Sequence, residues 1–405
     1  MKIKKLYLNL PKILETIFTI ISENNGECRL IGGCVRDIII NNTPIDFDIA
    51  TDLDPLKVTK IFMDKGINVI PIGIKYGTVL VQLKNTNFEI TTLRKDAQCF
   101  GRDAKVTFVK NWKEDAARRD FTINAMSISP DLILYDYFNG EHDLLQKKVK
   151  FIGNPNIRIK EDNLRILRYL RFLACFGLKN IDFGSYLAAI KNIGLVELLP
   201  RERVKKEVMR LLCSKYAKDV LIELNKKNYF PYIGLSTVII NNRKLEEIEL
   251  KIGDSLVNLA ILLSISKTFN KESFILIKKS LCLSNKELKD IKLLASFNKK
   301  EAFSDFHHYK FLHELGNIYY LRLLFVVKNT STVKRYKQYY AMSQKRVYYN
   351  FPIKGEDIRK LMVSRSVIGY ILKDAKNEWH KLKNNVSKEC IMQYIEKKYL
   401  DKNKR

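Results

Sequence analysis

Apolar and polar positions repeat with two different periods along this chain, and the change of period separates an α/β part from a helical remainder. Between Leu30 and Ile133, short alternating apolar runs predict strands, and runs at spacings of three and four residues predict helices between them. Residues 1–25 carry apolar side chains at helical spacing and predict a leading helix. From about Val208 onward the pattern is helical.

The most informative part of the α/β region is the stretch from Leu30 to Asp52. A glycine pair, Gly32 and Gly33, follows an apolar strand, and Arg36 comes just before an apolar run that predicts a helix. Because glycine has no Cβ, the backbone can come close to a bulky charged ligand here. A helix N-terminus and an arginine fork both favour a phosphate at this place.

Two aspartates follow at strand spacing. The run from Ile45 to Ile49 alternates, so that Asp46 and Asp48 are predicted to share one face of a strand. Two half-buried carboxylates side by side repel each other unless a cation lies between them. Two Mg²⁺ ions roughly 3.5–4 Å apart are the usual clamp for transfer of a phosphoryl or nucleotidyl group. An isolated Asp-x-Asp is more often a solvated strand edge, so these residues alone leave both interpretations open.

A second group of charges lies within Glu114–Met126. Arg118, Arg119 and Asp120 are consecutive, so on a helix they would spread over a wide arc and could not all bind one group. One arginine would bind a triphosphate, and Asp120 would bind a ribose hydroxyl or form a structural ion pair. Taken alone, three such charges are more typical of a solvated helix face.

A third segment predicts a helix with one apolar and one charged side. Asp162, Arg165, Arg168 and Arg171 follow one another every three residues along the charged side. Cytosine and adenine present an amine beside a ring nitrogen acceptor, whereas guanine and uracil present the reverse. Asp162 as acceptor and Arg165 as donor would fit C and A, and a wrong base would leave buried groups unpaired at roughly 1–3 kcal/mol each. The alternative is an ordinary intrahelical pair worth about 0.2–0.5 kcal/mol.

Composition adds a class of partner. The 405 residues, 46% of them hydrophobic, can bury sizeable cores, and a net charge of +28 with a pI near 9.6 favours nucleic acid as partner. An abundance of lysine accounts for part of this charge. Seven cysteines without a Cys-x-x-Cys pair, and only five histidines, argue against a zinc site and a disulfide framework and favour a reducing compartment. No long uncharged apolar run predicts a membrane span.

In combination, these motifs resemble the class II tRNA nucleotidyltransferase and bacterial poly(A) polymerase family of polymerase-β-like nucleotidyltransferases. The resemblance rests on Gly-Gly-x-Val-Arg-Asp followed by Asp-x-Asp, on Arg-Arg-Asp-Phe-Thr-x-Asn-Ala, and on Glu-Asp-x-x-Arg, and it is densest over residues 28–207. It implies a polymerase-β-like α/β head followed by all-α neck, body and tail domains. The implied ranges are 1–150 for the catalytic head, 151–215 for a neck that reads the incoming base, 216–330 for the body and 331–405 for a basic, tRNA-binding tail.

The resemblance also implies roles for individual residues. Asp46 and Asp48 would hold two Mg²⁺ ions, and Glu89 would be a third catalytic carboxylate beside them, with an exposed strand glutamate as the alternative. Glu202 would orient an arginine of the base-reading helix, and the charged segment 94–110 resembles a flexible loop needed for adding the final adenosine. The residues expected to contact the nucleotide are Gly32, Gly33, Arg36, Arg118, Arg119, Asp120, Asn124, Asp162, Arg165, Arg168 and Arg171.

The implied reaction is transfer of CMP and AMP from CTP and ATP to the 3′ end of tRNA, with release of pyrophosphate. The implied partners are tRNA, ATP and CTP, without a membrane or a protein partner, and the expected location is the bacterial cytoplasm or an organellar matrix. A poly(A) polymerase or an enzyme that adds only the terminal A is the nearest alternative, although Ile72–Val79 is closer to the CCA-adding pattern. A basic RNA-binding protein with an inactive head is the second alternative, and the intact carboxylates argue against it.

Three histidines could suggest a metal site. His307, His308 and His313 lack partner ligands at metal-binding spacing, so they are expected at the surface.

Overall fold

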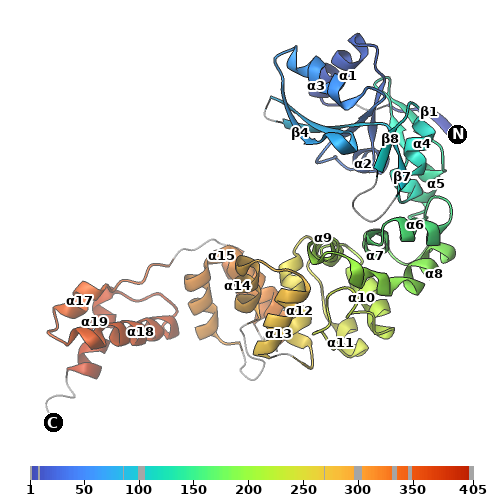
Figure 1. Cartoon of the computed structure of the whole chain (residues 1–405). Coiled ribbons are helices and arrows are strands. Elements are labelled where there is room, and N and C mark those ends of the chain that lie inside the picture. The colour runs from blue at the N-terminus through green and yellow to red at the C-terminus, as the bar shows by residue number, and fades with distance from the viewer. Residues whose placement is uncertain are drawn as a thin grey trace. The chain divides into compact units, whose positions relative to one another are not determined.

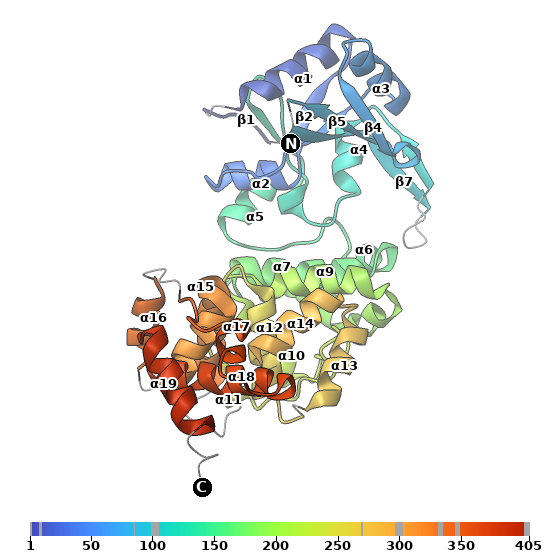
Figure 2. The same ribbon diagram turned by 90° about the vertical axis from the view of Figure 1, so that its left-hand side faces the viewer.

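The computed structural model describes residues 2–7, 10–84, 86–98, 105–268, 270–295, 303–330, 335–344 and 349–400. The chain forms two compact units, Met1–Ser236 and Thr237–Arg405. A layered α/β region lies at the N-terminal end, and the rest of the described chain is helical (Figures 1 and 2). The predicted fold class, an α/β head followed by all-α domains, is therefore confirmed. The first unit contains both the predicted head and the predicted neck, and the boundaries between the four domains remain predictions.

A mixed sheet forms the centre of the first unit. Its strands are β1 (Lys2–Lys5), β2 (Cys28–Ile31), β3 (Asp48–Thr51), β4 (Asn68–Gly73), β5 (Thr78–Leu83), β6 (Thr86–Thr92), β9 (Ser127–Ile128) and β10 (Ile133–Asp136). They are arranged in the order β1-β10-β9-β2-β3-β6-β5-β4. β3 and β6 run parallel to each other, and the remaining neighbours are antiparallel. A separate two-stranded ribbon consists of β7 (Arg94–Gln98) and β8 (Lys105–Phe108).

Helices lie on both sides of this sheet. The helices of the α/β part are α1 (Lys12–Glu23), α2 (Gly33–Ile39), α3 (Pro55–Met63), α4 (Trp112–Ala117) and α5 (Gly140–Leu145). The elements that follow are α6 (Pro155–Glu161), α7 (Leu164–Phe176), α8 (Phe183–Lys191), α9 (Arg201–Leu212) and α10 (Ala217–Lys226). Short 3-10 turns are η1 (Ile74–Tyr76), η2 (Thr122–Asn124) and η3 (Ile193–Leu198). α1 and α3 cover one side of the sheet, and α2 and α5 lie on the side that faces α7 (Figure 2).

Local sequence signals explain where several helices begin. The side chain of Asp54 accepts a hydrogen bond from the backbone N–H of Leu56, and Pro55 is the first residue of α3. The same combination of a capping side chain and a proline starts α6, where Asn154 precedes Pro155. Both helices begin at these positions because an N-cap side chain and a proline at the first helical position act through neighbouring residues only.

The prediction of one leading helix is wrong for its first part. Residues 2–5 form the edge strand β1, which pairs with β10, and the helix starts only at Lys12. Lys2 and Lys4 lie two residues apart on this strand, and both form ion pairs with the buried carboxylate of Glu141. A buried carboxylate requires cationic partners, and the strand conformation supplies both on one face.

The prediction of a structureless loop over residues 94–110 is also wrong at both of its ends. β7 and β8 pair there from Arg94 with Phe108 to Gln98 with Lys105, and residues 99–104 lie outside the described residues. The base of the ribbon packs against Gly77, where an added Cβ would lie 2.8 Å from the Phe108 ring and where φ is +82°. Glycine is therefore required at that contact.

The second unit is helical throughout its described part. Its helices are α11 (Asn242–Glu247), α12 (Ser255–Ile265), α13 (Lys271–Ser280), α14 (Asn285–Leu294), α15 (Asp305–Thr330), α16 (Tyr336–Gln344), α17 (Gly355–Arg359), α18 (Arg365–Lys381) and α19 (Lys388–Tyr399). α12 is buried along nearly its whole length and packs against α14 and α15. α15 is kinked at Gly316. Trp379 is the largest side chain of a separate apolar cluster that holds α17, α18 and α19 together. Among the helices described, none is both long and apolar enough to cross a membrane.

The histidines of α15 differ from the expectation of surface residues. His308 is fully buried, its Nδ1 lies 2.6 Å from the hydroxyl of Tyr320, and its ring stacks on Tyr339. His313 is partly buried and its ring packs edge-on against Trp379. Both histidine rings pack against aromatic side chains of the core. The spacing of the histidines in the sequence does not indicate this burial.

We expect this burial to make the second unit sensitive to acid. Burial lowers the pKa of His308 to about 4, although Asp305 acts in the opposite direction. The unfolded chain would take up this proton near pH 6.5, so stability is fully present above pH 6.5 and is lost as the pH falls toward 4. At pH 5 the loss from His308 should be on the order of 2 kcal/mol. Calorimetry of the wild type and His308→Gln between pH 5 and 7.5 checks this, and an equal pH dependence in both proteins would contradict it.

Candidate active site

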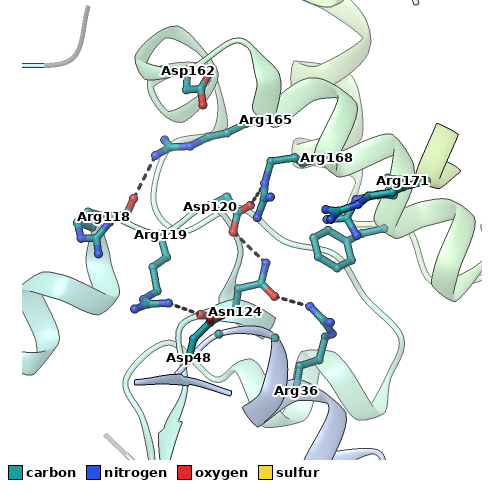
Figure 3. A pocket seen from close by; sticks show the side chains of 14 residues that line it. Arg36, Asp48, Arg118, Arg119, Asp120, Asn124, Asp162, Arg165, Arg168 and Arg171 are labelled. Carbon is teal, nitrogen blue, oxygen red and sulfur yellow. Dashed lines mark hydrogen bonds and ion pairs between the residues drawn. The ribbon is translucent and has the colours of Figure 1, made fainter. Parts of the chain in front are cut away.

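A cavity of about 480 Å³ lies between the sheet side that carries α2 and the helix α7 (Figure 3). All of the residues predicted to contact the nucleotide line it, together with one predicted metal ligand and two residues that the sequence interpretation missed. The lining residues are Gly32, Gly33, Arg36, Asp48, Arg118, Arg119, Asp120, Asn124, Asp162, Arg165, Arg168, Arg171, Phe172 and Arg210.

Gly32 forms the turn between β2 and α2. Its φ of +73° is in the region that favours glycine, and an added Cβ would lie 3.5 Å from Nη1 of Arg119 and 3.7 Å from Oδ2 of Asp48. A side chain at this position would therefore project toward the polar groups of the cavity. The turn brings the backbone close to the site, as the glycine pair predicts.

The carboxylates lie where β3 and β6 run side by side. Asp48 is the first residue of β3 and is in register with Glu89 on β6. Burial raises the pKa of Asp48, the nearby charges of Glu89 and Asp46 add to this effect, and Arg119 opposes it. Asp48 lines the cavity, whereas Asp46 and Glu89 are exposed and are not among the lining residues. Their predicted roles as catalytic groups remain predictions.

The prediction that Asp46 belongs to the same strand as Asp48 is wrong. β3 begins only at Asp48, and Ile45, which alternation would place on the packed face, is 93% exposed. The pairing of β2 with β3 extends only as far as Leu30 opposite Ile49, so the residues before Asp48 have no strand partner there. Within the ranges described, no three His, Cys, Asp or Glu side chains are arranged to hold one metal ion.

The Arg-Arg-Asp motif also departs from the helical interpretation. α4 ends at Ala117, and Arg118 and Arg119 lie in the turn that follows it. Both arginines bind the buried Asp115, at 2.7 Å for Arg118 and 2.9 Å for Arg119. Although burial alone would raise the pKa of Asp115, Arg119 and Arg118 hold it below its usual value. Because one carboxylate fixes both guanidinium groups, both line the cavity, and the solvated helix face is excluded.

Asp120 forms the structural ion pair that was one of its two predicted roles. Its Oδ2 accepts a hydrogen bond of 2.5 Å from Nε of Arg168, and its Oδ1 accepts from Nδ2 of Asn124 at 2.9 Å. Oδ1 of Asn124 in turn accepts from Nη1 of Arg36 at 3.0 Å. Burial would raise the pKa of Asp120, but the charge of Arg168 holds it below its usual value. These contacts form a continuous polar chain from α2 to α7 (Figure 3).

Asp162 does not lie on the helix that carries the three arginines. α6 ends at Glu161 and α7 begins at Leu164, so Asp162 is an extended residue between them. Its Oδ2 accepts a hydrogen bond of 2.9 Å from Nη2 of Arg203. Arg165 instead pairs with Glu161, at 2.5 Å. The alternative of an ordinary Asp162–Arg165 pair is therefore wrong, yet both residues line the cavity.

Other residues were missed by sequence reasoning. Glu207, rather than the exposed Glu202, orients an arginine of the predicted strip, since its Oε2 lies 2.7 Å from Nε of Arg171. Glu207 shares the buried face of α9 with Val204, Val208 and Leu211, and this helical spacing is a signal that could have found it.

The ring of Phe172 lies between two guanidinium groups. It is 4.1 Å from Cζ of Arg171 and 5.2 Å from Cζ of Arg36, measured to the ring centroid. Such contacts are attractive cation–π interactions. Phe172 therefore joins an arginine of the α/β part to an arginine of α7, and apolar periodicity alone gives no signal for this arrangement.

Residues 28–150 match the protein family described as the Poly A polymerase head domain. The fold and this match thus define a nucleotidyltransferase head followed by a helical part. The chain is 30% identical to the human mitochondrial CCA tRNA nucleotidyltransferase 1 over an alignment of 411 residues. This alignment covers 95% of this chain and 90% of the human protein. The chain therefore belongs to the CCA tRNA nucleotidyltransferase family, and the predicted family resemblance is confirmed.

Solved structures have the same fold. The CCA-adding enzyme of Bacillus stearothermophilus in complex with CTP superposes with a TM-score of 0.79 at 22% identity, over 98% of this chain and 100% of that chain. The Thermotoga maritima CCA-adding enzyme complexed with tRNA superposes with a TM-score of 0.68 at 19% identity, over 98% and 99%. These two matches support the fold described above.

Proposed function

We propose that this chain adds CMP and AMP, taken from CTP and ATP, to the 3′ end of tRNA to complete a CCA terminus. The observation that carries this proposal is one cavity with Asp48 on one wall, Asp162 and Arg165 on the opposite wall, and Arg118 and Arg119 between them. A nucleoside triphosphate would lie between these walls, with its phosphates near the arginines and its base near α7. The human relative is named for this reaction, and the Bacillus stearothermophilus and Thermotoga maritima enzymes form complexes with CTP and with tRNA, respectively.

The donor chemistry fits Mg²⁺. Asp48 and Asp46 offer hard carboxylate oxygens, and their mutual repulsion with Glu89 contributes to the raised pKa of Asp48. Mg²⁺ usually binds through one or two carboxylates together with substrate phosphates and water, so a complete cage of protein ligands is not needed. When bound, two such ions would supply charge neutralisation on the triphosphate and activation of the attacking 3′-oxygen.

The chain's own residues orient the nucleotide. Arg118 and Arg119, held by Asp115, would bind phosphate oxygens through their forked N–H groups. Asp162 would accept from the amine of C or A, and an N–H of Arg165 would donate to the adjacent ring nitrogen. The pairing of Asp162 with Arg203 fixes the direction of this carboxylate. In U and G, a carbonyl oxygen would face the carboxylate of Asp162 and a ring N–H would face the N–H of Arg165, so neither hydrogen bond could form.

The compartment is inferred from the cysteines. The seven cysteines include no Cys-x-x-Cys pair, and this usage favours a reducing compartment such as the bacterial cytoplasm. Relatives include the mitochondrial human protein and a bacterial enzyme, so the organellar matrix is the second candidate.

The test is incubation of the purified protein with tRNA that lacks its 3′ terminus, Mg²⁺, CTP and ATP, with products resolved at single-nucleotide resolution. We expect extension by C, C and A, followed by a stop. Long A tails would favour the poly(A) alternative, and a single A added only to tRNA ending in CC would favour the A-adding alternative. Absence of extension would favour an RNA-binding protein with an inactive head.

A further inference from the structure

We propose that Arg158 of α6 is a positioning residue that couples base reading to triphosphate binding. The inference rests on the proposed function of the same cavity. Arg158 belongs to no sequence motif discussed above and does not line the cavity. Its contacts nevertheless reach the backbone of the Arg-Arg-Asp turn and the side chain of Arg165.

The first observation is the way in which the end of α4 is held. Carbonyl oxygens at the C-terminal end of a helix lack intrahelical donors and need other partners. Nη2 of Arg158 donates to the carbonyl oxygens of Ala117 at 3.0 Å and of Arg119 at 2.6 Å. Nη2 of Arg165 donates to the intervening carbonyl oxygen of Arg118 at 3.1 Å (Figure 3). Two arginines from the helical part thus hold three successive carbonyls of the head.

The second observation is that these two arginines are fixed to each other. Oε2 of Glu161 lies 2.6 Å from Nη1 of Arg158 and 2.5 Å from Nη1 of Arg165. The backbone carbonyl of Arg158 also accepts a hydrogen bond of 2.8 Å from Nη1 of Arg165. The side chains of Arg158 and Arg165 are 12% and 10% exposed, so water screens these contacts only weakly. A displacement of Arg158 would therefore displace Arg165.

Together these contacts join two functions in one rigid group. The turn held by Arg158 carries Arg118 and Arg119, whose guanidinium groups line the cavity at the proposed phosphate position. Arg165 faces the proposed base position. The planar fork of Arg158 holds the two carbonyls through Nη2 and Glu161 through Nη1, and lysine, with a single ammonium group, cannot reproduce this geometry. Through Arg158, the placement of the base by Arg165 and the binding of the phosphates by Arg118 and Arg119 therefore depend on each other.

The experiment compares Arg158→Met and Arg158→Lys with Lys160→Met, an exposed position on the same helix. KM and kcat for CTP, discrimination between CTP and UTP, and Tm are measured on full-length protein and tRNA. We expect Arg158→Met to raise KM for CTP and to lower CTP-over-UTP discrimination, each roughly tenfold, because small displacements of positioning groups have effects of this size or larger. Arg158→Lys should be intermediate, and Lys160→Met should equal the wild type.

A lowered Tm with unchanged KM and unchanged discrimination would overturn the proposal and leave Arg158 a purely structural residue. If Arg158→Met does not fold, Arg158→Lys and Glu161→Gln carry the test, since both keep the size of the side chain. A wild type that adds no nucleotide would refute the proposed function itself. If the wild type completes CCA and Arg158→Lys has the same KM for CTP and the same CTP-over-UTP discrimination as the wild type, only the coupling is refuted.

Discussion

Asp48→Asn is expected to reduce nucleotide incorporation on the order of a thousandfold or more, which corresponds to at least ~4 kcal/mol of transition-state stabilisation. Asp48 is the one predicted metal ligand that lines the cavity, and its register with Glu89 places a second carboxylate beside it. An amide of the same shape binds Mg²⁺ poorly because it carries no charge. Single-turnover incorporation of CMP measures the loss.

The same variant should keep its stability and its affinity for tRNA. Burial and Glu89 raise the pKa of Asp48, so the charge of this carboxylate is less favourable in the folded protein than in the unfolded chain. The neutral amide removes this less favourable charge, and Tm should be equal to or above that of the wild type. Asp64→Asn, at an exposed position of the same unit, serves as the control. Incorporation at the wild-type rate would show that Asp48 is not a metal ligand.

Asp162→Ala is expected to relax the choice of base, with discrimination against UTP and GTP falling roughly 10- to 100-fold. A carboxylate that accepts from the amine of C and A would repel the carbonyl groups of U and G. Without the carboxylate, the hydrogen bond to C and A and the repulsion of U and G are both lost. We expect kcat/KM for UTP and GTP to rise by a larger factor than kcat/KM for CTP falls. The measurement is kcat/KM for each of the four nucleotides on tRNA that accepts the first C.

The ion pair of Asp162 with Arg203 requires a second variant. If Asp162 served only to hold Arg203, then Arg203→Ala would relax discrimination as much as Asp162→Ala does. If Asp162 reads the base, Arg203→Ala should retain most of the selectivity, because Asp162 keeps a second hydrogen bond from the backbone N–H of Leu164. Unchanged selectivity in Asp162→Ala itself would assign this residue a structural role.

The sequence by itself determined the α/β-then-helical order and most of the residues that line the cavity, although Phe172 and Arg210 were missed. Gly32 and Arg36 lie four positions apart in one motif, and the helix that carries Arg165, Arg168 and Arg171 follows from local spacing. Such features depend on backbone preferences and on neighbours within a few positions. Periodicity therefore reports them before any tertiary contact is known.

Only the tertiary structure decided which partner each charge takes and where the helices stop. Arg168 binds Asp120, 48 positions away, and Asp162 binds Arg203, 41 positions away. Glu207 holds Arg171 across 36 positions. The predictions that Asp120 and Asp162 lie within helices were wrong. Both residues lie outside helices, and each binds an arginine from a distant segment. Ion pairs between distant segments form only when the folded backbone brings them together, and spacing along one segment carries no information about them.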